Sequence, residues 1–451
     1  MNAPAYPKTK SSGIEWLGDV PEHWEVRRLK FAIRTNPVKS EIVEVSGDSL
    51  VSFVPMDAVG EYGGMNLEKE KMVDEVYTGY TYFADGDVVI AKITPCFENG
   101  KGAIAAGLKN GIGFGTTEFH VLRAEKSCDR RFLFYLTISH PFRKIGASEM
   151  LGAGGQKRVP EDFIKNLTLG MPPVSEQRAI AEFLDRKTGQ IDQLIGKKKE
   201  LIQKLNEQRS ALITAAVTGK LQSEIGNPHS PMCDSGIAWL GKIPEHWNVR
   251  RLKFLTKVIG GGTPSTGNSK YWNGDIPWVS PKDMKSDLID SAQDNITELG
   301  AAESATKVVQ PNTVLIVVRS GILRHTIPVA RNTVAVALNQ DMKGFTPENG
   351  LTPEYLHLLI VGNQKQLLPL WSKPGCTVES LEVELMMNTG IPAPPVQEQQ
   401  AIAEYLDEKT GKIDGLIRKT ETAIQTLEEY RTALITAAVT GKIDVRAFTC
   451  R

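Results

Sequence analysis

Ser12-Gly-Ile-Glu-Trp-Leu-Gly-Asp-Val-Pro-Glu-His-Trp-Glu-Val-Arg-Arg-Leu-Lys-Phe31 returns later in the chain as Ser235-Gly-Ile-Ala-Trp-Leu-Gly-Lys-Ile-Pro-Glu-His-Trp-Asn-Val-Arg-Arg-Leu-Lys-Phe254, identical at 16 of 20 positions. A second block, residues 172–220, returns as residues 394–442 with 34 of 49 positions identical. The inserts between these blocks, residues 32–171 and 255–393, have nearly equal lengths and almost no identity. A period this long excludes a solenoid, whose units have about 20 to 50 residues. The sequence therefore predicts a pseudo-twofold molecule in which a repeated frame holds two different inserts.

Each copy of the second block predicts one long helix. A Pro-Pro pair ends the strand-like segment before it, because proline cannot continue a strand ladder, and Glu176 favours a helix N-terminus. Apolar residues recur every seven positions in two rows, which is the pattern of a coiled-coil seam. Gly219 and Gly441 mark the expected helix ends, where glycine can adopt the left-handed conformation. The predicted seam consists of Leu184, Ile191, Leu205 and Leu212 with Ile180, Leu194, Leu201 and Ala215 in the first helix, and Leu406, Ile413, Leu427 and Leu434 with Ile402, Leu416, Ala423 and Ala437 in the second.

A continuous helix over residues 176–218 would be about 65 Å long at roughly 1.5 Å per residue, and its apolar seam must be buried. The nearest partner is the other helix of the same chain, and pseudo-twofold symmetry would set the two helices antiparallel. Alternatively, each helix pairs with a helix of another protein. The first arrangement predicts two modules joined by an intramolecular antiparallel coiled coil.

The two inserts predict α/β modules. Residues 87–92 and 102–106 are short apolar runs bounded by Gly, Asp and Pro, as in strands, and residues 131–138 are typical of a helix. The second insert repeats this order with different residues, in strands at 313–319, 327–330 and 334–338 and a helix at 354–360. We therefore expect one fold for both modules, with the largest differences in the loops, where recognition usually lies.

Composition is that of an ordinary globular protein. The 451 residues are 41% hydrophobic and 24% charged, with 53 basic and 53 acidic residues. The longest strongly apolar run is too short to span a bilayer and the N-terminus lacks a signal core, so a cytoplasmic location is expected. The five cysteines are scattered without a Cys-x-x-Cys pair, which predicts neither a disulfide framework nor a metal site. The zero net charge counts against a protein that simply coats nucleic acid.

Three features together resemble the DNA-specificity subunit of type I restriction-modification enzymes. These are the paired Pro-Glu-His-Trp segments, the helices that begin Pro-Pro-Val-x-Glu-Gln and end Ala-Leu-Ile-Thr-Ala-Ala-Val-Thr-Gly-Lys, and the Gly261-Gly-Thr-Pro-Ser-Thr266 start of the second insert. The resemblance covers essentially the whole chain. It implies two target recognition domains separated by the antiparallel coiled coil, each reading half of a split, asymmetric sequence in double-stranded DNA.

The resemblance also implies partners and boundaries. The repeated frame would dock two adenine methyltransferase subunits, joined for restriction by two translocase and nuclease subunits. No cofactor is expected on this chain, and S-adenosylmethionine, ATP and magnesium are implied for the partners. The implied division is a first recognition domain with its frame segment (1–171), the first helix (172–220), a linker (221–234), the second recognition domain (235–393), the second helix (394–442) and a tail (443–451).

The sequence carries no motif for catalysis by the chain itself. An adenine methyltransferase needs an Asn/Asp-Pro-Pro-Tyr/Phe loop, whereas both Pro-Pro pairs here precede valine. The glycine-rich stretch at 262–267 has Asn268 where a phosphate-binding loop has lysine. The chain is therefore expected not to be an enzyme.

Bases are read by Arg or Lys at guanine, Asn or Gln at adenine and apolar contacts at thymine, while further Lys and Arg meet phosphates. The divergent loops supply such residues. In the first insert these are Lys92, Thr94, Asn99, Lys101, Thr116, Thr117, Gln156, Lys157 and Arg158, and in the second Ser265, Thr266, Lys270, Tyr271, Trp272, Arg319, Ser320, Arg324, Asn339, Gln340 and Lys373. The frame residues Trp16, Trp24, Trp239, Trp247, His23 and His246 are expected to pack, because residues identical in both copies cannot distinguish two half-sites.

Two other functions compete with DNA recognition. A coiled-coil adaptor that assembles proteins without reading DNA explains the repeat and the zero net charge. It does not explain donor-rich loops confined to the divergent inserts. A self-sufficient nuclease or methyltransferase would need motifs that the sequence lacks.

Overall fold

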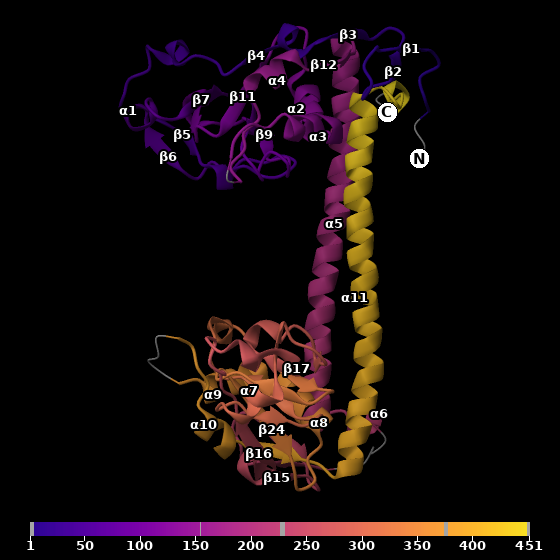
Figure 1. The fold of residues 1–451 in the computed structure, drawn as a ribbon. Coiled ribbons are helices and arrows are strands. Elements are labelled where there is room, and N and C mark those ends of the chain that lie inside the picture. The colour runs from indigo at the N-terminus through magenta and orange to yellow at the C-terminus, as the bar shows by residue number, and fades with distance from the viewer. Residues whose placement is uncertain (1–3, 154, 226–230, 374–377, 449–451) are drawn as a thin grey trace. The chain divides into compact units, whose positions relative to one another are not determined.

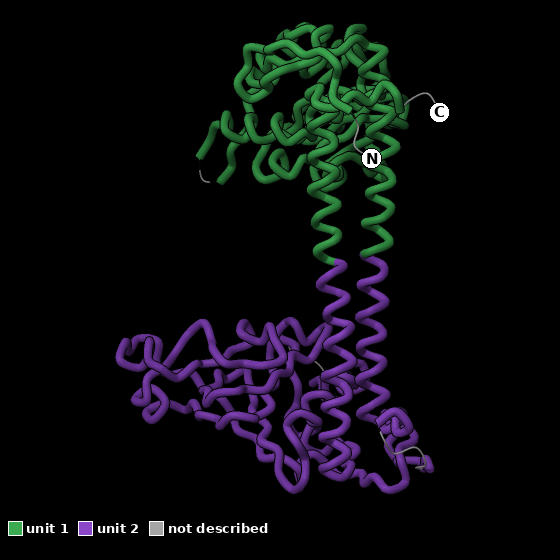
Figure 2. The backbone as a smooth tube through the Cα atoms, turned by 90° about the vertical axis from the view of Figure 1, so that its right-hand side faces the viewer, with its two compact units in different colours: residues 1–198, 421–451 green, residues 199–420 purple. Residues whose placement is uncertain are grey.

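The computed structural model of the chain describes residues 4–153, 155–225, 231–373 and 378–448. It divides into two units, residues 1–198 with 421–451 and residues 199–420 (Figure 2). Each unit contains one α/β module together with a part of both long helices (Figure 1). Gly154, Cys376, residues 226–230 of the predicted linker and residues 449–451 of the predicted tail lie outside the described residues. The chain-order domain boundaries stay a prediction.

The first module contains two four-stranded sheets, ordered β6-β5-β10-β7 and β4-β11-β8-β9. β5 and β10 are parallel, and the other neighbours are antiparallel. All four residues of β8 are buried, which explains its continuous apolar sequence. The strands are β4 (Ile33–Thr35), β5 (Leu50–Val54), β6 (Glu70–Met72), β7 (Thr81–Ala84), β8 (Val88–Ala91), β9 (Gly102–Ile104), β10 (Ile112–Gly115) and β11 (Phe119–Ala124).

The second module repeats this topology strand for strand. Its sheets are ordered β19-β17-β23-β20 and β16-β24-β21-β22-β18, with β17 parallel to β23 and one additional edge strand, β18. The prediction of one fold for two divergent inserts is therefore confirmed. The strands are β16 (Thr256–Gly260), β17 (Trp272–Val279), β18 (Leu288–Ile289), β19 (Asp294–Ile296), β20 (Val308–Val309), β21 (Val314–Val317), β22 (Val329–Asn332), β23 (Val336–Leu338) and β24 (Met342–Pro347).

The helices and the frame strands also recur in pairs. β3 (Glu25–Arg28) pairs with β12 (Thr168–Met171), and β15 (Asn248–Arg251) pairs in the same antiparallel way with β25 (Gly390–Ala393). The module helices are α2 (Arg130–Ile138), α3 (His140–Ser148) and α4 (Glu161–Asn166) in the first unit and α8 (Pro353–Gly362), α9 (Gln364–Trp371) and α10 (Val383–Asn388) in the second. Shorter elements are β1 (Thr9–Ser11), β2 (Asp19–Pro21), α1 (Val73–Val76), α6 (Gln222–Ile225), β13 (Met232–Asp234), β14 (Lys242–Pro244) and α7 (Glu298–Ala302).

Two continuous helices of equal length, α5 (Val174–Val217) and α11 (Val396–Val439), form the repeated second block (Figure 1). They pair antiparallel in both units. In the first unit the early part of α5 meets the late part of α11, with Asp192 bonded to Arg431. In the second unit the late part of α5 meets the early part of α11, with Arg209 beside Asp414. The intramolecular antiparallel coiled coil is therefore confirmed.

The end of each long helix packs on the frame of the other copy. Gly219 and Gly441 follow the helices with φ values of +76° and +71°, the left-handed conformation predicted for them. A Cβ atom on Gly219 would lie 2.3 Å from Pro244, and one on Gly441 would lie 2.4 Å from Pro21, so both contacts require glycine. The Thr-Gly-Lys segment that follows α11 therefore packs within the first unit, and the one that follows α5 packs within the second unit.

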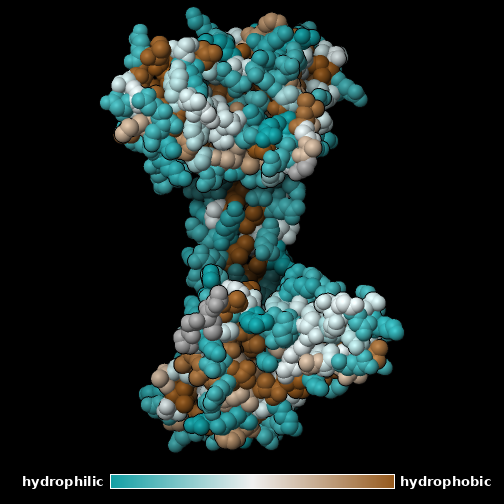
Figure 3. Space-filling model, turned by 60° about the vertical axis from the view of Figure 1, so that its left-hand side comes forward, coloured by the Kyte–Doolittle hydropathy of each residue, from teal (hydrophilic) through white to brown (hydrophobic). Residues whose placement is uncertain are grey.

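The seam of the coiled coil includes the first of the two predicted rows and part of the second. Leu184, Ile191, Leu205, Leu406, Ile413 and Leu434 are buried, and Leu212 and Leu427 are half-buried. In the second predicted row, Ile180 and Ile402 are buried and Ala215, Ala423 and Ala437 are half-buried, but Leu194, Leu201 and Leu416 are 44%, 46% and 52% exposed. The residue after each of them, Ile195, Ile202 or Ile417, is buried or half-buried instead. At these three leucine positions the second row therefore lies four residues after the first row rather than three, and Figure 3 shows apolar side chains that remain exposed along the helices.

Candidate nucleic-acid interface

The loops of the first module that the sequence marked for DNA contact lie together. Lys92 follows β8, and its backbone N–H donates to the Glu118 carbonyl at 2.9 Å. The Thr94 N–H donates to the Lys157 carbonyl at 3.0 Å, and the Lys157 N–H donates to Thr94 Oγ1 at 2.9 Å. Three segments far apart in sequence, residues 92–101, 116–118 and 155–158, thus form one surface at the end of the β8–β11 ladder. We call this surface the first loop cluster.

Arg158 is held across the first loop cluster by Glu118. Arg158 Nε lies 3.1 and 2.8 Å from the two Glu118 carboxylate oxygens, and Nη2 lies 2.8 Å from Oε1. The Arg158 side chain is nevertheless 44% exposed. Hydrogen bonding to Arg158 lowers the pKa of Glu118 below its ordinary value, so this carboxylate is charged at neutral pH. Sequence analysis missed Glu118, because an isolated glutamate in a turn is typical of a solvated side chain.

The other predicted residues of the first module differ in how exposed their polar groups are. Gln156, Lys157 and Thr117 are exposed at the surface of the cluster, and Lys92 is half-buried. Three are engaged within the module. Lys101 Nζ donates to the Met56 carbonyl at 3.2 Å, Asn99 Nδ2 donates to Glu61 at 3.1 Å, and Thr116 Oγ1 accepts the Glu118 N–H at 3.2 Å.

The second module brings its predicted loops together in the same place. The Val318 N–H donates to the Asp341 carbonyl at 2.8 Å, and Lys373 N–H donates to Ser380 at 2.9 Å beside a bridge between Ser380 and Arg319. Arg319 Nε donates to Asp341 Oδ1 at 2.6 Å. Residues 319–324, 339–341, 373 and 378–380 therefore form a second loop cluster at the end of the β21–β24 ladder.

A second exposed arginine in this cluster is also paired. Arg324 Nε donates to Glu379 Oε1 at 3.1 Å, and the Arg324 side chain is 67% exposed. Ser320 caps the short turn between the two arginines by accepting the Ile322 N–H.

The glycine-rich start of the second insert packs against the same cluster. The Gly262 N–H donates to the Leu338 carbonyl at 2.8 Å, and Thr263 donates to the Gln340 side chain. A Cβ atom on Gly261 would lie 1.8 Å from the Asn339 carbonyl, so only glycine fits there. Ser265, Thr266 and Lys270 are exposed in this loop.

Three predicted residues have structural roles instead. Trp272 donates to the Ser265 carbonyl at 3.1 Å and packs edge-on against the Trp278 ring at 5.2 Å. Asn339 is only 6% exposed and accepts the Asp341 N–H at 3.0 Å. The Tyr271 hydroxyl donates to Glu303 at 2.7 Å, a bond that raises the Tyr271 pKa. These contacts orient the loops, and they leave less polar surface for a ligand than the sequence suggested.

One histidine and one tryptophan of each frame converge on one carboxylate. His23 Nε2 lies 2.6 Å from Glu176 Oε2, and Trp24 Nε1 donates to Oε1 at 3.0 Å. In the second unit His246 lies 2.6 Å from Glu398, and Trp247 Nε1 donates to the same carboxylate at 2.9 Å. The repeated Pro-Glu-His-Trp and Glu-Gln segments therefore lock the start of each long helix to its own frame.

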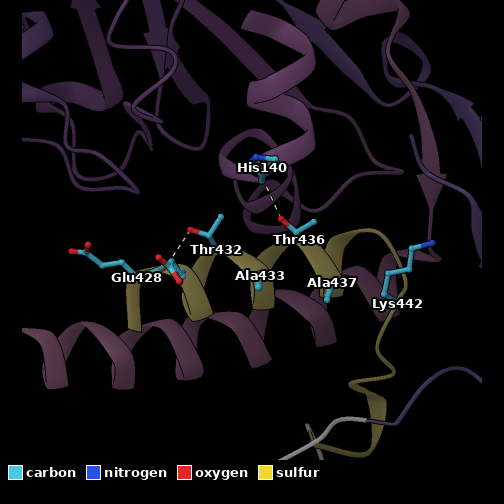
Figure 4. Close-up of a pocket in the computed structure, with 8 residues that line it drawn as sticks. His140, Glu428, Thr432, Ala433, Thr436, Ala437 and Lys442 are labelled. Atoms are coloured by element: carbon cyan, nitrogen blue, oxygen red, sulfur yellow. Dashed lines mark hydrogen bonds between the residues drawn. The ribbon is translucent and has the colours of Figure 1, made fainter. Parts of the chain in front are cut away.

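Each unit also has a groove beside the late part of a long helix. In the first unit His140 at the start of α3 faces Thr436 of α11, and the His140 N–H donates to Thr436 Oγ1 at 3.3 Å (Figure 4). In the second unit Thr214 of α5 donates to the Gly362 carbonyl at the end of α8. Thr214 and Thr436 are 222 positions apart, the offset of the repeat. Corresponding positions line both grooves, namely Glu429, Thr432 and Ala433 in the first and Glu207, Ser210 and Ala211 in the second.

Within the described ranges there is no group of three or more His, Cys, Asp or Glu side chains arranged to bind a metal ion. Over the same residues, no helix combines the length and the apolar character needed to cross a membrane.

Two modules of one topology, each with basic loops gathered at the same edge, define a duplicated recognition protein on a helical frame. The chain belongs to the family of the type I restriction modification DNA specificity domain, whose family model matches residues 21–204 and 244–426. The type I restriction enzyme EcoAI specificity subunit of Escherichia coli is 44% identical over 165 residues, which are 36% of this chain and 27% of that protein. The EcoR124I/EcoR124II specificity subunit of Escherichia coli is 40% identical over 185 residues, 40% of this chain and 46% of that protein. The matched part is therefore less than half of each of these relatives.

Solved structures show the same fold over nearly the whole chain. A chain from a structure on complex assembly and conformational transition of the type I R-M system has a TM-score of 0.74 at 20% identity, and it covers 94% of this chain and 99% of its own. The HsdS subunit from Thermoanaerobacter tengcongensis has a TM-score of 0.52 at 19% identity, with 94% and 98% covered.

Proposed function

We propose that this chain is a non-catalytic DNA-recognition and scaffolding subunit that reads a bipartite, asymmetric site in double-stranded DNA. The observation that carries this proposal is the pair of loop clusters. They lie at the same edge of two modules with one topology, and they differ in nearly every side chain. Equivalent positions with unlike donors suit two different half-sites, because hydrogen-bond donors on loops are what distinguish one base edge from another.

The repeated frame supports fixed spacing between the half-sites. α5 and α11 are each continuous over 44 residues. Each helix is hydrogen-bonded to a frame at its start and packs against a frame just after its end. Such a pair resists changes in length better than a flexible linker does. The unread spacer in the DNA is therefore set by the helices in this proposal.

The two grooves support docking of two identical partners. They repeat with the 222-residue offset and include matching glutamate, hydroxyl and alanine positions. The partners in this proposal are two adenine methyltransferase subunits, with two restriction subunits where the host has them. S-adenosylmethionine, ATP and magnesium then belong to those subunits and not to this chain.

The test is to map methylated adenines by single-molecule sequencing in cells that express the methyltransferase subunit with and without this chain. A split, asymmetric motif that appears only with the chain supports the proposal, and exchange of residues 32–171 for another insert should then change one half of the motif. A stable complex with an active methyltransferase subunit but without any motif would favour the adaptor function instead.

A further inference from the structure

Glu118 and Asp341 occupy the same position in the two modules. In the first sheet Ala91 pairs with Phe119, and in the second Val317 pairs with Met342. One residue beyond these pairs, the chain makes the same hydrogen bond twice: the N–H of Lys92 reaches the Glu118 carbonyl, and that of Val318 reaches the Asp341 carbonyl. Glu118 and Asp341 are therefore the residues directly before β11 and β24, which are equivalent strands of the two modules.

Each module has an equivalent isolated β-bridge, and the arginine that binds the carboxylate lies on opposite strands of this bridge in the two modules. Ile93 bridges to Arg158 in the first module, and Arg319 bridges to Ser380 in the second. Register places Arg319 where the first module has Ile93, and Ser380 where it has Arg158. Both modules therefore place an arginine beside the equivalent carboxylate, but each module supplies that arginine from a different position in its sequence. The arrangement recurs even though the two inserts have almost no identity. If these arginines were only solvated loop side chains, there would be no reason for the same arginine–carboxylate pair to occur in both modules.

The geometry of the first pair leaves one edge of the guanidinium available. Arg158 uses Nε and Nη2 for Glu118, which is the side edge of the planar group. Nη1 and the second hydrogen of Nη2 form the end edge, which is the pair of donors that matches guanine O6 and N7. Glu118 fixes the plane of the guanidinium while leaving that edge toward solvent, where the side chain is 44% exposed.

The neighbouring carboxylate also favours a base over a phosphate. A DNA phosphate that approached Arg158 or Arg319 would face a second negative charge, on Glu118 or Asp341. A guanine edge carries no net charge and avoids this repulsion. Lys157 is exposed in the same cluster and lies outside the Arg158–Glu118 pair, so it suits phosphate contact.

We propose, on the basis of the DNA-reading function above, that Arg158 and Arg319 each read a guanine at equivalent places in the two half-sites, and that Glu118 and Asp341 are their positioning residues. The recognised sequence then has a G·C pair in each half. Discrimination at that pair depends on both members of each arginine–carboxylate pair.

The test measures methylation by the complete complex on duplexes in which each base pair of the mapped motif is replaced in turn. Arg158→Lys and Glu118→Gln should both lose discrimination at the same single G·C pair of one half, by roughly 5- to 100-fold. Arg319→Lys and Asp341→Asn should do so at one pair of the other half. Lys157→Ala is the matched control. It should weaken the binding of all DNA sequences evenly, and it should reduce the slope of log binding constant against log salt concentration by about one.

Several results would overturn this assignment. These are a half-site without a G·C pair, an even loss on all sequences with the arginine variants, and an unchanged profile with the carboxylate variants. Glu118→Asp keeps the charge and should retain discrimination, and circular dichroism of each variant separates lost reading from lost folding. Failure of the wild-type complex to methylate any motif would instead reject the proposed function.

Discussion

Arg431 Nη1 of α11 lies 2.5 Å from Asp192 Oδ1 of α5, and the Arg431 guanidinium also stacks over the Tyr62 ring at 4.1 Å. The same ion pair recurs in the second unit, where Arg209 Nε lies 3.1 Å from Asp414 Oδ1. Arg431 lies 222 positions after Arg209, and Asp414 lies 222 positions after Asp192, so the two pairs are related by the offset of the repeat. Each arginine lies on the second seam row, four residues after the first, so the pair fixes one antiparallel register in both units.

Replacement of Arg431 by alanine should lower the free energy of unfolding by about 1–2 kcal/mol, because the side chain is 14% exposed and loses its contacts with Asp192 and Tyr62. Asp192→Ala should cost less, about 0.5 kcal/mol, because Asp192 is half exposed and solvent screens its charge. A double-mutant cycle from urea unfolding measures the coupling between them. Arg209→Ala and Asp414→Ala form the matched cycle in the other unit. Coupling near zero in both cycles would contradict a role in register.

The position of the second seam row predicts a large difference between two adjacent residues. Ile195 is 6% exposed and Leu194 is 44% exposed. Ile195→Asn should destabilise the chain by about 3 kcal/mol, because it buries an amide in an apolar seam, whereas Leu194→Asn should cost less than about 0.5 kcal/mol. Thermal unfolding of the two variants, measured on the isolated chain, decides between the two rows. Equal losses would restore the row predicted from sequence.

The sequence could not decide that row because both alternatives are apolar. Leu194-Ile195 and Leu201-Ile202 each place two large aliphatic residues in succession, and Leu416-Ile417 does so in the other helix. A heptad row at 184, 191 and 205 accepts a partner row either three or four residues later. Only the opposing side chains, among them Arg431 and Arg209, select the second option. The helices, their ends and the common fold of the modules followed from repetition and periodicity, which can both be read directly from the order of the residues.

The loop clusters were foreseen as groups but not in their internal contacts. Donor-rich loops are visible in sequence, whereas the pairing of Glu118 with Arg158 spans 40 residues and depends on strand register. Asn339 and Trp272 fit the chemistry of base contact in sequence, yet the first is buried and the second packs on Trp278. Composition shows which groups a loop carries, and only the fold shows which of them are already bonded.

Acidic pH should destabilise the chain through two buried histidines. Burial lowers the pKa of His120 below its ordinary value near 6.5, and Lys92 acts in the same direction, while Glu161 and Glu118 oppose it. The unfolded chain therefore binds the proton more readily than the folded chain does. The contribution of the neutral histidine to the free energy of unfolding is fully present above the unfolded pKa of about 6.5. It is lost as the pH falls from there toward the lowered folded pKa, with a slope of at most about 1.4 kcal/mol per pH unit for one proton.

Burial lowers the pKa of His357 in the second unit as well. His120→Gln retains a donor for the Val159 carbonyl, which His120 Nε2 contacts at 2.8 Å, and should flatten the pH dependence of stability below about pH 6.5. His357→Gln should remove a separate part of the pH dependence of stability, and the double variant should remove both parts. Urea unfolding at closely spaced pH values measures these slopes, and slopes identical to the wild type would show that neither histidine contributes.

Glu176 and Glu398 should differ in their importance although they occupy the same position of the repeat. Glu176 accepts the Tyr6 hydroxyl at 2.6 Å in addition to its histidine and tryptophan partners, and its side chain is 6% exposed. The Glu398 side chain is 21% exposed. Glu176→Ala leaves the indole N–H of the fully buried Trp24 without this acceptor and should cost about 3 kcal/mol, whereas Glu398→Ala should cost about 2 kcal/mol. Tryptophan fluorescence during urea unfolding measures both losses. Because the donors remain after either substitution, a Glu176→Ala chain as stable as the wild type would mean that water replaces the carboxylate, and the frame would then be held by packing alone.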